Sequence, residues 1–481
     1  MTTWQLVQIL QAAIFIIGVS VGVGVLKLPP RIAIIASILI LPAPIIRVSP
    51  GTAGFIYSAD LLAAAFVLVW FINSRRKPLT IYLSLSVQRI AAGLLFLFPI
   101  ISSTLALADS ETYRNIKYVL LSHARALGYL IVFLAIAGFI KKVARPDNIL
   151  VLQIALFSLV AICGLVQYGL GANLDLWNEV NRSVAGQEIG DFGGGIMGLY
   201  RGAVGAWGVG ILAAASAILP MKKYGSGFLA LVILCCMSIM ISVGSRQGVI
   251  IGAAVLVYGL LSSLRGFRPR TRTIMILRSL SGFALLIVLV LAGYWRTDER
   301  FQQFTANRYG PLLSYERLKS ELVGRDAEKR RLVLENIGKY PSILITGVGY
   351  GTDVDFSGGR ALLYLDSEIF MLVQSNGGLF VLCYIFFLYK LRVRLRKSYR
   401  PKDPFGASYV FSAVLALYAG ILLMWGHFFL MNIGPSQAPV AYWNWALLGG
   451  AVGLCTHSSK PMHSSGRSDL ASPSSSIRLK D

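Results

Sequence analysis

Long runs of apolar residues constrain this chain more than any other feature of its sequence. Runs such as 6–26, 150–170 and 362–389 reach or exceed the roughly 20 residues that a helix needs to cross the hydrocarbon core of a bilayer. They lack the alternation expected of strands in a membrane barrel. Because 56% of the 481 residues are hydrophobic and only 14% are charged, the apolar side chains exceed what one soluble core buries. We therefore expect helices that face lipid or one another.

The predicted fold is all-α, a polytopic integral membrane bundle of about 12–13 transmembrane helices. Pro42 and Pro44 interrupt a short second span, and the number is twelve if that span is re-entrant. The first apolar stretch lacks a preceding basic region and a small-residue cleavage site, so we expect a retained span. The predicted spans are 5–26, 31–46, 56–72, 86–107, 118–140, 149–170, 200–220, 226–243, 247–264, 275–294, 362–389, 406–431 and 440–456.

Clusters of Lys and Arg fall on alternate connections between these spans. The positive-inside rule assigns those connections to the cytoplasm. The net charge of +23 is then expected to meet anionic lipid headgroups, and nucleic acid is not a predicted partner. The clusters lie at 75–77, 141–145, 222–223, 265–272 and 390–397.

One membrane domain, 1–456, is predicted to carry two sizeable outer loops, 171–200 and 295–361. The second loop contains an amphipathic stretch, 325–338, which we expect to form a surface helix. It also contains Gly347-Val-Gly-Tyr-Gly351, whose glycines permit close approach of the backbone to a ligand. These loops are the predicted reaction chamber. The tail 457–481, rich in Ser and charge, is expected to be disordered in the cytoplasm.

The cysteine positions and the absence of nucleotide-binding motifs argue against several kinds of site. All five Cys lie inside apolar runs, so the sequence predicts neither disulfides nor a metal cluster. No HExxH, P-loop or Rossmann fingerprint is present in a strand-to-helix context, which argues against nucleotide use.

Three motifs follow one another between residues 244 and 378. Gly244-Ser-Arg-Gln-Gly248 is expected at a tight outer turn between two spans, and a large outer loop then runs to Gly347-Val-Gly-Tyr-Gly351. The segment 365–378 enters the next long span. In this order the motifs resemble the bacterial O-antigen polymerase and O-antigen ligase superfamily, over roughly residues 50–430.

The resemblance implies a metal-independent, inverting glycosyltransferase without a cofactor. Its donor would be an undecaprenyl-diphosphate-linked oligosaccharide, and its partners would include membrane lipids and chain-length regulator and flippase proteins. The site would face the periplasm or exterior from the bacterial plasma (inner) membrane. The expected function is polymerisation of O-antigen or exopolysaccharide repeat units, with a ligase as the alternative.

Arginine is the expected ligand for the diphosphate, because its planar fork matches phosphate oxygens and keeps its charge. Arg246 is the predicted catalytic cation, and the alternative is that it snorkels at a helix end. The spacing from Arg182 to Gly193 is similar to an outer-loop motif of the polymerases. Arg325 could instead pair with a neighbouring acid on an exposed face. The predicted substrate-binding residues are Arg182, Arg201, Arg325, Gly347 and Gly349.

Asp366 and Glu368 are the candidates to steer and deprotonate the acceptor hydroxyl. The ligase branch has histidine and asparagine where this chain has Asp366 and Ser367, which favours a polymerase. The alternatives for both acids are exposure at the mouth of a span and neutralisation of Arg360. His427 reads as an interhelical hydrogen-bond partner, and Asp60 as a structural acid near a membrane end.

Two other functional classes fit a polytopic protein. A transporter or flippase commonly places ionisable groups at mid-membrane depth, whereas the predicted spans here are nearly free of charge at that depth. A noncatalytic scaffold for polysaccharide assembly is the third possibility.

Overall fold

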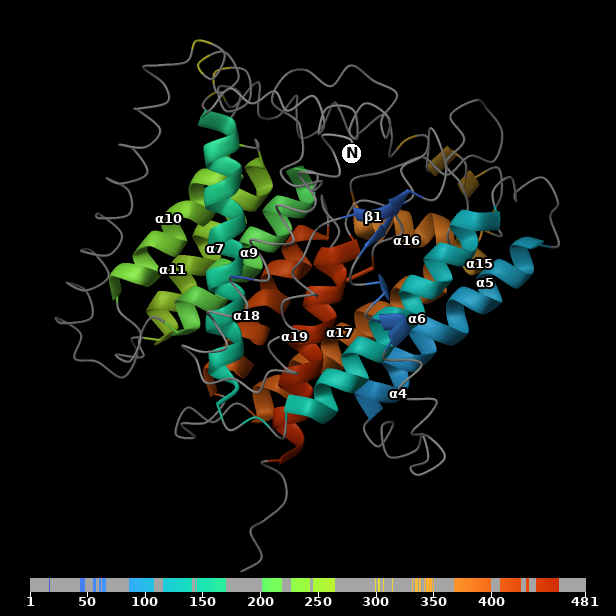
Figure 1. Ribbon diagram of the computed structural model, residues 1–481. Helices are drawn as coiled ribbons and strands as arrows, with labels where there is room; N and C mark the ends of the chain where they lie inside the picture. The colour runs from blue at the N-terminus through green and yellow to red at the C-terminus, as the bar shows by residue number, and fades with distance from the viewer. Residues whose placement is uncertain are drawn as a thin grey trace, which may run out of the picture.

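A computed structural model describes the chain as a set of packed helices, with a short strand pair beside them (Figure 1). The described residues include most of 86–107, 116–169, 201–263 and 367–457, together with scattered positions elsewhere. The predicted spans 5–26 and 275–294, the loop 171–200 and residues 458–481 lie outside the described residues, apart from Ile17. Of the predicted surface helix, 325–338, only Arg331, Leu334, Glu335, Ile337 and Gly338 are described, all helical.

Six of the predicted spans, from 86–107 to 247–264, are helical in the structure, and their ends shift by about two residues at most. Most of the described residues are helical, as expected for the all-α class, seven lie in strands, and the rest connect these elements. Its longer elements are α4 (Ser86–Ala92), the π-helical η2 (Gly93–Leu97), α5 (Phe98–Leu107), α6 (Ile116–Phe139), α7 (Asp147–Gly169), α9 (Arg201–Ile218), α10 (Ser226–Ser242), α11 (Arg246–Ser263), α16 (Glu368–Asn376), α17 (Gly378–Ser398), α18 (Ala407–Leu423) and α19 (Ala438–His457).

The predicted span 362–389 is corrected in two ways. It is broken at Gly377, where φ is 87°, into α16 and α17. It also continues past Tyr389 to Ser398, so the basic run lies on the helix and not in a connection. Long basic side chains are good helix formers and can bury their stems while their charges reach water, which explains the extension.

The span predicted at 406–431 is wrong at its end, because α18 stops at Leu423 and residues 430–431 are not helical. The backbone N–H groups of Leu430 and Met431 bond instead to the Glu368 carboxylate. Strands were not expected, yet β1 (Pro44–Arg47) pairs antiparallel with β2 (Phe55–Tyr57), at the edges of two predicted spans. Their β-branched and aromatic residues favour extended backbone.

Small residues allow the helices to pack closely and reveal their relative directions. A Cβ at Gly248 would overlap the backbone of Gly205, and a Cβ at Gly259 would overlap Ser216. The later residue of α11 contacts the later residue of α9, so the two helices run parallel. In the same way Gly449 and Gly453 of α19 pack on the backbone of α6, which also runs parallel to its partner. Small side chains at such crossings are typical of helix packing in membranes.

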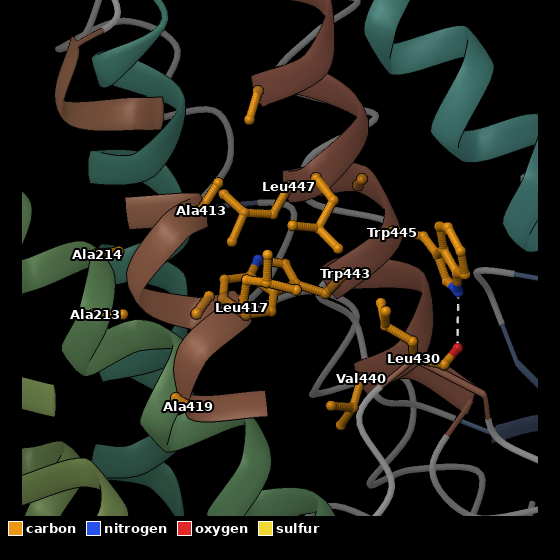
Figure 2. Close-up of a cluster of buried hydrophobic side chains, with 14 of the residues drawn as sticks. Ala213, Ala214, Ala413, Leu417, Ala419, Leu430, Val440, Trp443, Trp445 and Leu447 are labelled. Atoms are coloured by element: carbon orange, nitrogen blue, oxygen red, sulfur yellow. Dashed lines mark hydrogen bonds between the residues drawn. The ribbon is translucent and has the colours of Figure 1, made fainter. Parts of the chain in front are cut away.

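Aromatic and aliphatic side chains of α9, α18 and α19 fill the centre of the bundle (Figure 2). Trp443 packs against Gly210 of α9, and Trp445 stacks edge-on against Phe133 of α6. The indole N–H of Trp445 donates to the carbonyl of Leu430 over 2.7 Å, the dashed line in Figure 2. A buried indole with a partner contributes apolar area without an unsatisfied donor.

Two helical segments, Ser86–Thr104 and Leu120–Phe139, are long and apolar enough to cross a membrane by length and composition alone. Other apolar helices among the described residues are shorter by the same measure. The described helices thus do not by themselves confirm the predicted polytopic bundle.

Candidate functional site

The carboxyl end of α18 joins two of the sequence motifs that lie about 120 positions apart in the chain. The side-chain amide of Gln247, at the start of α11, donates to the carbonyl of Leu422 over 3.2 Å. Two residues further on, the Met424 carbonyl accepts a bond of 3.0 Å from the Ser367 hydroxyl and one of 3.4 Å from the N–H of Ile369. The structure therefore brings the start of α11 and the start of α16 to one place, which we call the α18 junction.

Arg246 begins α11 at this junction, and its side chain is half-buried. Ser245 precedes it, fully buried against Gly205 of α9. The parallel packing of α9 and α11 puts their amino-terminal ends side by side, and α9 begins at Arg201. Helix amino termini carry partial positive charge and free N–H groups, so paired ends that each begin with arginine suit an anion.

Glu368 lies at the first position of α16 and is 0% exposed. Its carboxylate accepts from the Tyr384 hydroxyl over 2.5 Å, from Leu430 N–H over 3.1 Å and from Met431 N–H over 3.1 Å. Charge-assisted bonds of this kind are strong and directional. Exposure at the mouth of a span was the alternative expected for this acid. The structure contradicts that alternative, because Glu368 is buried.

Gly347 and Gly349 both adopt positive φ, 69° and 107°, and pack against the carboxyl end of α16. The Gly349 N–H donates to the Ser375 carbonyl over 3.0 Å. A Cβ at Gly347 would overlap that carbonyl. The glycines are required here by a close approach between two backbones, whatever further ligand the segment takes.

Several predicted site residues lie outside the described residues: Arg182, Arg325 and Asp366, together with His427. Arg201 is described only as the first residue of α9. Asp366 directly precedes Ser367 in the chain.

Sequence reasoning missed the partners of the candidate acids. Tyr384, Ser367 and the Met424 carbonyl carry no signal that separates them from ordinary residues of an apolar helix. Asp60, expected as a structural acid near a membrane end, forms a largely buried ion pair with Arg125, with 3.2 Å between Nη2 and Oδ2. The Tyr442 hydroxyl also donates to Asp60 over 3.0 Å, which links the pair to α19.

Within the part of the chain that the structure describes, no group of three His, Cys, Asp or Glu residues is close enough to hold a metal ion. The junction offers arginine, helix amino termini and a carboxylate with bound donors. These groups can bind an anion and hold a neighbouring segment in position.

No protein-family model matches this chain, and a search of curated proteins finds no significant match. The resemblance to the O-antigen polymerase and ligase superfamily therefore rests on the motifs alone.

Proposed function

We propose that this protein is a polytopic membrane enzyme that polymerises glycan repeat units carried on undecaprenyl diphosphate. The observation that supports this most directly is the α18 junction, where the start of α11 with Arg246 and the start of α16 with Glu368 both bond to the carboxyl end of α18. These two segments belong to different motifs of the resemblance. Their attachment to the same helix end is what one active site built from both would require.

Helix directions support a membrane orientation with this junction on the outer side. The basic residues Lys390 to Lys397 gather at the carboxyl end of α17, and Lys222 and Lys223 follow the end of α9. The amino-terminal ends of α9, α11 and α17 are the opposite ends. The positive-inside rule then assigns the basic ends to the cytoplasm and the amino-terminal ends to the outside.

Exposed apolar side chains support contact with lipid. On α17 they form one stripe, since the spacings of three and four residues repeat along one helix face. Such a stripe costs free energy in water and none in hydrocarbon. The stripe consists of Leu379, Leu382, Phe386 and Tyr389.

In the proposed reaction, the diphosphate of the donor lies against Arg246 and the amino-terminal ends of α9 and α11. The acceptor hydroxyl attacks the anomeric carbon, forming a C–O bond while the bond to the diphosphate oxygen breaks and its electron pair leaves with the phosphate. Asp366 takes the hydroxyl proton. Negative charge grows on the departing oxygens, so a cation fixed beside them stabilises the transition state more than the ground state.

Glu368 has a positioning role in this proposal and is not the base. Its oxygens already accept from Tyr384, Leu430 and Met431. These bonds fix the start of α16, the helix that begins two residues after Asp366 in the chain, against Leu430 and Met431, which follow α18.

The test compares the length distribution of surface and lipid-linked glycan in wild-type cells, a deletion strain and strains carrying Arg246→Ala or Arg246→Lys. We expect single repeat units in the deletion strain and a loss of polymer of about 100-fold or more for Arg246→Ala. Lysine keeps the charge but not the fork, so Arg246→Lys should recover part of the activity. Arg396→Ala, at the basic end of α17, is the matched control and should leave the profile unchanged.

Other glycan length profiles would indicate a different function. Long chains that accumulate on the carrier lipid in the deletion strain would indicate a ligase. A profile that the deletion leaves unchanged would contradict the enzyme, and movement of lipid-linked units in proteoliposomes without bond formation would then establish a transporter.

A further inference from the structure

The break between α16 and α17 holds a concentration of buried polar side chains. Gln374, Ser375 and Asn376 are consecutive, end α16 and are all buried. Gly377 follows with positive φ and interrupts the helix. Polar residues are rarely buried without a partner, because each loses its hydrogen bonds to water.

Two of these side chains, Ser375 and Asn376, have no hydrogen-bond partner among the described residues. Their exposed fractions are 0% and 2%, and among the described residues neither the Ser375 hydroxyl oxygen nor the Asn376 amide oxygen and nitrogen has a hydrogen bond. Leaving a buried polar atom unsatisfied costs about 1–3 kcal/mol. Such atoms in a native fold are expected to meet a water or a ligand.

Two backbone groups at the break already have hydrogen-bond partners. The Ser375 carbonyl accepts from the Ser102 hydroxyl of α5 over 2.9 Å and from the Gly349 N–H over 3.0 Å. The Gly377 N–H donates to Val373 within the helix. Gly347 and Gly349 therefore cover the break, while the side chains of Ser375 and Asn376 remain open to a further partner.

The hydroxyl of Ser375 and the amide of Asn376 are suited to bind a hydroxyl group. An amide presents a donor and an acceptor side by side, and a serine hydroxyl can serve as either. A metal cation would satisfy the oxygens but leave the two amide N–H bonds without acceptors, and an anion would leave the amide oxygen without a donor. A hydroxyl group donates and accepts at once, so it satisfies both kinds of atom.

The break also lies at the right end of its helix for an extracytoplasmic ligand. Gly378 begins α17, and the basic run of the same helix begins at Lys390. At 1.5 Å per residue, the break lies roughly 18 Å from these basic residues, which the positive-inside rule assigns to the cytoplasm. Broken helices with exposed polar groups are where membrane proteins commonly build substrate sites.

We propose that Ser375 and Asn376 form a neutral subsite that binds a sugar hydroxyl of the glycan, beneath the segment of Gly347 and Gly349. This assignment rests on the proposed function for the identity of the ligand. Either a glycan or a trapped water can supply the O–H group that would bond to these side chains. The experiment below distinguishes the two.

The experiment uses the full-length protein in detergent, with lipid-linked repeat units extracted from the deletion strain as the probe. Initial rates are measured against probe concentration for wild type, Asn376→Leu and Ser375→Ala. Leucine has nearly the shape of asparagine, so the first variant removes polarity with little change of volume. Ser412→Ala is the matched control, because Ser412 is also buried, with a hydroxyl that lacks a partner, but lies on α18.

We expect KM to rise roughly 3- to 30-fold in Asn376→Leu and about 3- to 10-fold in Ser375→Ala, because one or two neutral hydrogen bonds are lost. The Ser412→Ala control should keep the wild-type KM. If the site holds only water, both variants keep the wild-type KM and the assignment is overturned. If Asn376→Leu fails to fold, the KM of Ser375→Ala alone tests the assignment: a raised KM supports it and a wild-type KM overturns it.

The same assay separates this inference from the proposed function. Polymer from wild type together with unchanged KM in the variants would overturn the subsite alone. An absence of polymer from the wild-type protein would overturn the proposed function, and the glycan assignment with it.

Discussion

Replacing Glu368 by glutamine should destabilise the protein far more than it changes the chemistry of the proposed active site. The carboxylate accepts from the Tyr384 hydroxyl and from the N–H groups of Leu430 and Met431. Glutamine keeps one acceptor oxygen but turns an NH2 group toward these donors, so at least one bond is lost. Hydrogen bonds to charged groups contribute about 1.5–3 kcal/mol each, and we expect a loss of that size in the free energy of unfolding.

Tyr384→Phe is the companion variant, because it removes one of the same bonds from the other side. Alone it should cost about 1.5 kcal/mol. In the double variant the two losses should fall short of their sum by about 1 kcal/mol, since both variants affect one interaction. Unfolding is followed by titrating the purified protein with denaturing detergent and recording the change in helix content.

Glycan turnover at a temperature where each variant remains folded provides the decisive comparison. A positioning role predicts that Glu368→Gln keeps the pH profile of the wild type, with a modest reduction in rate. If instead the variant unfolds like wild type but its turnover falls by about 100-fold or more, Glu368 acts as a general acid or base. The reasoning from its burial would then be wrong.

Further predictions concern the packing around the site. Asp60→Asn leaves buried Arg125 without its carboxylate and should cost about 3–5 kcal/mol in detergent unfolding, which Arg125→Gln in the same chain should partly restore. Gly449→Ala should cost about 1–3 kcal/mol, because its Cβ would overlap the Phe133 backbone, while Gly93→Ala, with open space at its Cβ, should not destabilise and serves as the control. Trp445→Phe loses the bond to Leu430 and should cost about 1 kcal/mol by the same measurement.

Apolar length predicted the helices well because burial of apolar area is a property of the segment itself. The span expected at 118–140 is α6, and the span expected at 226–243 is α10. The break at Gly377 was missed, since the residues on both sides continue the apolar pattern. Only the Gly377-Gly378 pair marked it, and glycine alone does not tell a break from a close helix contact.

The candidate site was predictable in part. The motif at 244–248 identified a residue at the start of α11, and the motif at 365–378 identified the start of α16. Their meeting at α18 could not be predicted, because it depends on carbonyls of Leu422 and Met424. Every residue has a carbonyl, so the sequence contains no sign of which ones a distant side chain will use.

The polar contacts also explain how similar apolar helices find specific neighbours. Apolar side chains pack against one another with little selectivity, whereas a buried hydrogen bond is lost if either partner moves. In this chain such bonds tie α16 to α17 through Tyr384, and α16 to the segments around α18 through Met424 and Leu430. The half-helix α16 makes several of them and is short, so its own helical hydrogen bonds contribute little to its position. The buried polar groups that fix α16 therefore also fix the position of the start of α16 relative to the α18 junction, where α11 begins with Arg246.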